Sequence, residues 1–139
     1  MTQAPKAGEK LPPKIIGPFV AAQLAAYAEI SGDSNPLHLD PDFARKIGFS
    51  ARPVHGMKLL AAFEPFLRDW RPDLSILGLH GQFLTPVLEG ETATLTARVV
   101  KCESGEAGFV AVLRLMALTE KGEPALIGEA RLYQPKSSF

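Results

Sequence analysis

Residues 28–56 read AEISGDSNPLHLDPDFARKIGFSARPVHG, and this stretch determines how the rest of the chain is organised. The run SGDSNP near its start cannot continue a helix, because Gly, Asp, Ser, Asn and Pro all favour turns. It holds Asp33, and His38 follows shortly after, so an acid and an imidazole lie close together in an irregular loop. The stretch ends at Gly56, where a small-residue turn opens an apolar segment. We interpret these residues as the functional centre and the remaining chain as its scaffold.

The residue spacing predicts one helix before this loop and one within the stretch. From Val20 to Ser31, an apolar stripe among strong helix formers predicts a helix of about three turns that stops at Gly32. Asp40 before a proline is typical of a helix N-cap, so we expect a short helix over Pro41–Ile47 that ends at Gly48.

The segment Val54–Trp70 is the most apolar long segment that still has a helical pattern. Because it is apolar nearly all round, we expect a central helix that is buried on most sides. Pro65 lies inside this pattern and should kink or shorten the helix, since proline removes a backbone donor and clashes with the preceding turn.

After Asp73 the pattern changes to short segments in which apolar and polar residues alternate, which is typical of strands. These segments are Ser75–Phe83, Thr92–Val100, Gly108–Ala117 and Ala125–Tyr133. Their connectors contain Gly and Pro and suit hairpins, so neighbouring strands should run antiparallel. A further short edge strand is expected within Lys14–Phe19. The resulting fold class is α+β, with a long apolar helix packed on one curved antiparallel sheet.

Length and composition limit the function classes. The 139 residues fit one domain, which we place at 14–139 after a loose lead-in over 1–13. The 15 basic residues balance the 15 acidic ones, so nothing indicates nucleic-acid binding. No apolar run is long enough to span a membrane. The single cysteine, Cys102, is interpreted as a strand thiol, and a cytoplasmic location is expected.

Asp33 and His38 are the leading candidates for chemistry. Held near one water, the pair could remove and return a proton, and imidazole suits this role because its ordinary pKa is near neutral. The spacing alone leaves open that Asp33 is only a turn residue and His38 only a surface or capping group. Asn35 is expected to hold the loop together through its side-chain amide. At Gly56 a free helix-start amide could stabilise an oxyanion, or the glycine could simply permit a tight turn.

The remaining histidines carry weaker signals. His55 could be a helix cap or a core residue, and His80 is expected to be structural. Together with His38 they lack close ligand spacing such as HxH or HExxH, so we expect no metal. The chain also lacks a GxSxG elbow and a GxxxxGK[ST] phosphate loop.

Three separated runs, YAEISGDSNPLHLDPDFARKIGF, RPVHGM and GQFLTPVLEGE, closely resemble the MaoC-like, (R)-specific enoyl-CoA hydratases. The resemblance extends over residues 19–91 and implies the hot-dog fold, in which an antiparallel sheet wraps a long helix. It also implies that Asp33 is the catalytic acid, His38 the catalytic histidine, Asn35 the loop support and the Gly56 amide the oxyanion donor. The implied reaction hydrates a trans-2-enoyl-CoA to an (R)-3-hydroxyacyl-CoA, or runs in reverse, without a cofactor, in a homodimer.

The resemblance also locates the substrate and leaves rival functions. We expect a substrate pocket near His55, Met57, Leu60 and Phe63. Lys58 departs from the usual apolar residue, and Ala61 and Ala62 replace a serine found in some relatives; the large Phe63, Phe66 and Trp70 could limit acyl length. The rivals are a dehydratase acting on acyl-carrier-protein or branched or dicarboxylic CoA thioesters, a hot-dog thioesterase, and a non-catalytic acyl-thioester binding subunit.

Overall fold

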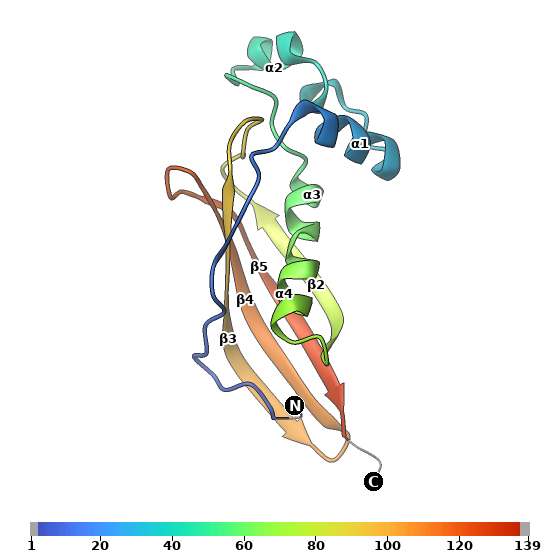
Figure 1. Ribbon diagram of the computed structural model, residues 1–139, viewed down its shortest axis with the longest axis vertical. Helices are drawn as coiled ribbons and strands as arrows, with labels where there is room; N and C mark the ends of the chain where they lie inside the picture. Colours follow the sequence, from blue (N-terminus) through green and yellow to red (C-terminus); the bar gives the residue numbers. More distant parts are fainter. Residues whose placement is uncertain (1–2, 137–139) are drawn as a thin grey trace.

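The C-terminal half of the chain forms most of one antiparallel sheet. The computed structural model describes residues 3–136, and its five strands have the order β1-β3-β4-β5-β2. Their bounds are β1 Lys14–Ile16, β2 Ser75–Phe83, β3 Ala93–Gly105, β4 Gly108–Thr119 and β5 Pro124–Pro135. Figure 1 shows a long, curved sheet with helices along one face and beyond one end. The α+β arrangement expected from the sequence is therefore present.

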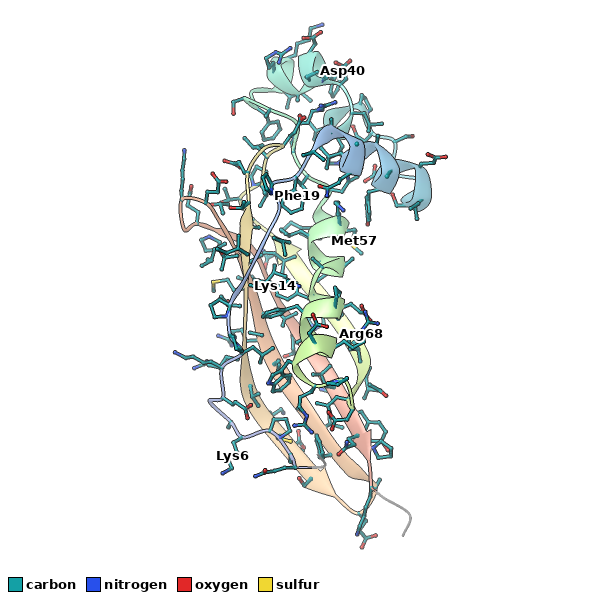
Figure 2. All side chains as sticks on the ribbon, in the orientation of Figure 1. Lys6, Lys14, Phe19, Asp40, Met57 and Arg68 are labelled. Carbon is teal, nitrogen blue, oxygen red and sulfur yellow. The ribbon has the colours of Figure 1, made fainter. Side chains whose placement is uncertain are left out.

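The helices fall into two groups. α1 (Ala21–Ser31), the 3-10 turn η1 (Pro36–His38) and α2 (Pro41–Ile47) gather beyond one end of the sheet, whereas α3 (Gly56–Ala61) and α4 (Phe63–Trp70) run along its face (Figure 1). In Figure 2, Phe19 and Asp40 lie toward the end that carries α1 and α2, and Lys6 lies toward the other end. The predicted bounds of α2 are confirmed, because the Asp40 carboxylate accepts hydrogen bonds from the first-turn amides and Gly48 ends the helix.

The strand alternation places one face of the sheet in the core. Leu95, Ala97 and Val99 of β3 are each at most 5% exposed, and their neighbours Thr96 and Arg98 face outward. On β4 and β5 the core side chains are Phe109, Ala111, Leu113, Leu115, Ala117, Ala125, Leu126, Ala130 and Leu132. The face of α3 and α4 that packs against them contributes Leu59, Leu60, Phe63, Phe66 and Leu67.

The expectation that β2 and β3 form a hairpin is wrong. β2 pairs antiparallel with β5 at one edge, so the connector over 84–92 crosses the sheet to β3, which lies between β1 and β4. This connector does not form a tight turn, because its Val87 is buried and its Leu88 pairs with Pro53. Tertiary contacts of the connector therefore override its turn-forming composition.

The prediction that Pro65 kinks or shortens the central helix is confirmed, and the break lies at Ala62, before the proline. A helical proline disturbs the hydrogen bond to the carbonyl four residues earlier, here that of Ala61. One side of the helix, which carries Met57, Ala61 and Arg68, is exposed within the single chain.

Residues before Lys14 are attached more firmly than the expected loose lead-in. Gly8 donates to the Val99 carbonyl at 2.8 Å, and Leu11 donates to the Ala97 carbonyl at 3.0 Å. Leu11 is buried, so this segment continues the sheet edge beyond β1. The polar composition of residues 1–13 did not indicate this pairing, because a chain can pair with a sheet edge through its backbone groups alone.

An ion pair fastens the end of the central helix to the sheet. Arg71 donates to both carboxylate oxygens of Asp73 at 2.8 and 2.7 Å, and Gln134 of β5 donates to Asp73 at 2.7 Å. These hydrogen bonds lower the pKa of Asp73 from 3.8 to about 2, and the hydrogen bonding from Arg71 has the largest effect. The bonded carboxylate therefore stabilises the fold only while it is ionised.

We expect Asp73→Asn to remove an acid-sensitive part of the stability. Because the pKa is lowered in the folded state, the contribution is complete above about pH 4 and is lost as the pH falls toward 2. It should amount to about 2 kcal/mol in the free energy of unfolding. Urea unfolding between pH 2.5 and 6 measures it, with the exposed Asp69→Asn as the control. An acid slope that is unchanged in Asp73→Asn would contradict this account.

Candidate active site

The loop between α1 and η1 is built by its own short side chains. α1 ends at Gly32, whose φ of 79° is the left-handed conformation that glycine adopts easily. The Ser31 hydroxyl then accepts from the Asp33 amide, and the Asp33 carboxylate accepts from the Asn35 amide at 3.3 Å. The Asn35 side-chain oxygen accepts from the Leu37 amide at 3.0 Å, as expected for a residue that holds the loop together.

This loop brings the two predicted catalytic side chains together. His38 Nδ1 donates to the Pro53 carbonyl at 2.8 Å, and because a carbonyl can only accept, Nδ1 carries the proton. In the neutral ring Nε2 is then an acceptor, and it lies 3.9 Å from Asp33 Oδ2. That separation is too long for a direct hydrogen bond but suits one water donating to both atoms. The imidazole is largely covered and the carboxylate is half exposed, so the pair is open to solvent on the Asp33 side.

The carbonyl that orients His38 is held by a second layer of contacts. On either side of Pro53, Val54 donates to the Val87 carbonyl and Glu89 donates to the Arg52 carbonyl, each at 2.8 Å. The Arg52 guanidinium donates to both carboxylate oxygens of Glu89 at 2.8 Å and to the Leu39 carbonyl at 2.9 Å. The mutual hydrogen bonds raise the pKa of Arg52 and lower that of Glu89, so both stay charged at neutral pH. Three segments that are distant in sequence are thereby fixed around Pro53.

His55 also lies in this cluster. Of the two roles expected for it, burial in the core is confirmed, whereas its contact with His38 was not predicted. Its ring stacks on that of His38, with centroids 4.0 Å apart, and its Nε2 donates to the Asp33 carbonyl at 3.2 Å. Tyr27 of α1 packs against the His55 ring in a tilted orientation, with the two ring centroids 4.8 Å apart. The sequence carried one signal for a special role of His55, namely its place directly before an apolar helix.

Gly56 begins α3 beside this cluster. The first α3 amide hydrogen bonded back to the preceding turn is that of Lys58, which donates to the His55 carbonyl. The amides of Gly56 and Met57 precede it and lack acceptors in the preceding turn. A Cβ added at Gly56 would lie 3.0 Å from the ring of Phe83 on β2. The glycine therefore allows close packing of Phe83, in addition to any role of its amide.

The residues expected to line a substrate pocket differ in their exposure, and the pocket itself stays a prediction. His55, Leu60 and Phe63 are buried, whereas Met57 on α3 is 57% exposed (Figure 2). The pattern of the amphipathic helix explains the difference, because Met57 lies on the side opposite the core. Phe66 is buried in the core and Trp70 is partly exposed.

The ligand atoms of Asp33, His38 and His55 lie within 4.8 Å of one another, which is close enough to consider a metal. His80 is elsewhere, on β2, where it faces Glu129. One feature disfavours a metal at the cluster: the two imidazole rings are stacked and present their faces to each other. His38 Nδ1 and His55 Nε2 donate to carbonyl oxygens, which leaves His38 Nε2 and His55 Nδ1 as the nitrogens that a metal would have to use. The sequence-based expectation of a metal-free site stays a prediction.

Comparison with known proteins places the chain in a family. The MaoC like domain matches residues 3–120. The chain belongs to the MaoC-like family. Over 119 residues, covering 84% of this chain and 87% of the relative, it is 36% identical to the (R)-specific enoyl-CoA hydratase of Aeromonas caviae. The solved structure of the (R)-hydratase from A. caviae covers 96% of this chain and 99% of its own, with 34% identity and a TM-score of 0.86.

A second relative is named for a different activity. The mitochondrial 3-hydroxyacyl-[acyl-carrier-protein] dehydratase of Arabidopsis thaliana is 40% identical over 73 residues, which cover 52% of this chain and 44% of that protein. The hot-dog fold and the MaoC-like family expected from the sequence are confirmed by these matches. Within residues 3–136 of this MaoC-like protein, none of the helices is long and apolar enough to cross a membrane.

We expect Arg52→Gln to weaken both the fold and the site, because it removes three hydrogen bonds that hold the Pro53 region. The free energy of unfolding should fall by about 2 kcal/mol, the usual range for losing charged hydrogen bonds at a partly buried site. Urea unfolding measures this change. Arg45→Gln is the matched control, since Arg45 pairs with Asp42 on the surface and should cost about 0.5 kcal/mol or less. Equal losses in the two variants would show that Arg52 has no special structural role.

Proposed function

We propose that this MaoC-like protein is a hydro-lyase that adds water to trans-2-enoyl-CoA and forms (R)-3-hydroxyacyl-CoA, and that it also catalyses the reverse dehydration. The observation that carries the proposal is the pair of acceptors, Asp33 Oδ2 and His38 Nε2, separated by 3.9 Å. A water held between them has both protons directed at bases and a lone pair free for attack. The similarity to the (R)-specific hydratase of A. caviae supports the substrate class and the stereochemistry.

The proposed reaction follows from this geometry. The bound water gives a proton to the Asp33–His38 pair while its oxygen forms a bond to C3 of the enoyl thioester. The electrons of the double bond move toward the thioester oxygen, where the free Gly56 amide stabilises the enolate. The pair then returns a proton to C2, so the sum is addition of one water. General acid–base assistance of this kind contributes about 10²- to 10⁴-fold.

Asn35 has a supporting part in this proposal. Its side chain accepts from the Leu37 amide and therefore shapes the turn between Asp33 and His38. The reaction moves only water and protons, which side chains and a backbone amide can handle, so we propose that no cofactor or metal takes part. A cytoplasmic location remains a proposal that fits the free thiol of Cys102.

We also propose that the protein is a homodimer joined at β2. β2 is an edge strand of nine residues that pairs only with β5 among the described strands, and unprotected edges of this length invite pairing with another chain. Leu77, Phe83 and Leu84 are exposed on or next to this edge, and Met57 is exposed on α3. A second copy would cover these apolar side chains and could contribute residues to the substrate pocket.

The carrier is the main alternative within the same chemistry. The plant relative is named for acyl-carrier-protein substrates, and its identity over the shared segment is comparable with that of the bacterial hydratase. Dehydration of 3-hydroxyacyl groups on acyl-carrier protein is therefore the second candidate. It would use the same Asp33 and His38 chemistry in reverse.

Purified protein should hydrate crotonyl-CoA to (R)-3-hydroxybutyryl-CoA without releasing thiol. The assay follows loss of the conjugated thioester, free thiol and product chirality, and the rate should survive dialysis against a chelator. Asp33→Asn and His38→Ala should each lower kcat by about 10²-fold or more while the fold is retained. Asp69→Asn is the matched control, because Asp69 is an exposed carboxylate on α4 that faces Lys14.

The outcomes separate the candidates. Thiol release would indicate a thioesterase instead. Turnover of acyl-carrier-protein substrates alone would favour the second candidate, and a folded Asp33→Asn protein with normal turnover would refute the proposed role of Asp33. Binding without turnover of any thioester would indicate a binding subunit.

A further inference from the structure

His55 is the buried polar side chain that the proposed reaction does not use. It is 1% exposed and occupies the residue before α3, but its side chain makes no capping hydrogen bond with that helix. Its Nδ1 is buried and has no hydrogen-bond partner among residues 3–136. Burying a polar nitrogen without a partner costs free energy, so a histidine at this place needs a physical reason.

The contacts of His55 supply that reason. Nε2 must carry the proton, because it faces the main-chain carbonyl of Asp33, which can only accept. The flat ring stacks on His38 with an interplanar angle of 25°. One side chain therefore holds the backbone of the proposed acid and the ring of the proposed base by two different interactions.

We propose that His55 is a positioning residue, whose Nε2–H fixes the Asp33 backbone and whose ring fixes the plane of His38. The proposal rests on the proposed function of the Asp33–His38 pair and goes beyond it. With both groups held, Asp33 Oδ2 and His38 Nε2 keep the separation at which one water bridges them. Loss of either interaction would let the two acceptors drift apart, and the water would lose one of its partners.

The surroundings favour the neutral form that this role requires. Burial lowers the pKa of His55, and the charges of His38 and Lys58 lower it further, while the hydrogen bond to Asp33 and the charge of Asp33 oppose the shift. Tyr27 faces the ring from α1, with the Lys58 ammonium 5.6 Å from the Tyr27 ring centre. His55 therefore stays uncharged at neutral pH and places no cation against the ring of His38.

Two substitutions separate the two interactions. His55→Phe keeps a flat ring for stacking but removes the donor to Asp33, whereas His55→Gln keeps an N–H donor but removes the ring. We expect each variant to lower kcat for crotonyl-CoA by 10-fold or more, with KM changed less than about 3-fold, because neither interaction contacts substrate. Asp69→Asn, which changes an exposed carboxylate on α4, should keep the parent kcat.

A double-mutant cycle distinguishes positioning from a general structural role. In the Asp33→Asn background, His55→Gln should lower kcat by less than 2-fold, because the group that His55 positions has already lost its function. The same loss in both backgrounds, or a folded His55→Gln protein with kcat within 2-fold of the parent, would overturn the proposal. If both His55 variants fail to fold, Tyr27→Leu loosens the ring from behind and should give the same non-additive pattern.

A second readout does not depend on turnover. In ¹⁵N-labelled protein, the His38 ring resonances should shift in His55→Gln and stay unchanged in Asp69→Asn. If the parent protein hydrates no thioester but the His38 resonances respond to His55, the proposed function is wrong and the positioning contact stands. Unchanged His38 resonances in His55→Gln would refute the positioning contact by themselves.

Discussion

The hydrogen bond from His38 Nδ1 to the Pro53 carbonyl is the interaction on which the site depends. It determines which ring nitrogen carries the proton, and it leaves Nε2 as an acceptor that faces Asp33. Without it, the ring could rotate or change tautomer, and a donor rather than an acceptor would face the carboxylate. The chemistry of the cluster therefore follows from the position of one backbone carbonyl.

That carbonyl is positioned by the fold as a whole. The connector after β2 crosses the end of the sheet and holds the segment around Pro53 through backbone pairing and the Arg52–Glu89 ion pair. The same connector binds the start of α1, because Gly90 donates to the Phe19 carbonyl at 2.7 Å. The sheet thus holds both ends of the helical segment that carries Asp33 and His38, although this segment lies beyond the sheet itself (Figure 1).

Local signals in the sequence predicted local structure well. The α2 helix was predicted to the residue because its cap, first proline and final glycine are neighbours in sequence. The partner of β2 and the ion pair of Arg52 with Glu89 were missed, since they join residues that are distant in sequence and depend on tertiary packing. The resemblance to MaoC-like hydratases predicted Asp33 and His38 as the catalytic pair, and the structure brings the two side chains together. It could not reveal that His55 stacks on His38, because a histidine before a helix has several ordinary roles.

The tautomer of His38 tests the central claim most directly. Long-range ¹H–¹⁵N correlation spectra of histidine-labelled protein near pH 8 report which ring nitrogen is protonated. The account predicts a neutral His38 with its proton on Nδ1 and an unprotonated Nε2. A neutral ring with its proton on Nε2 would contradict it, because the water could then not donate to both His38 and Asp33.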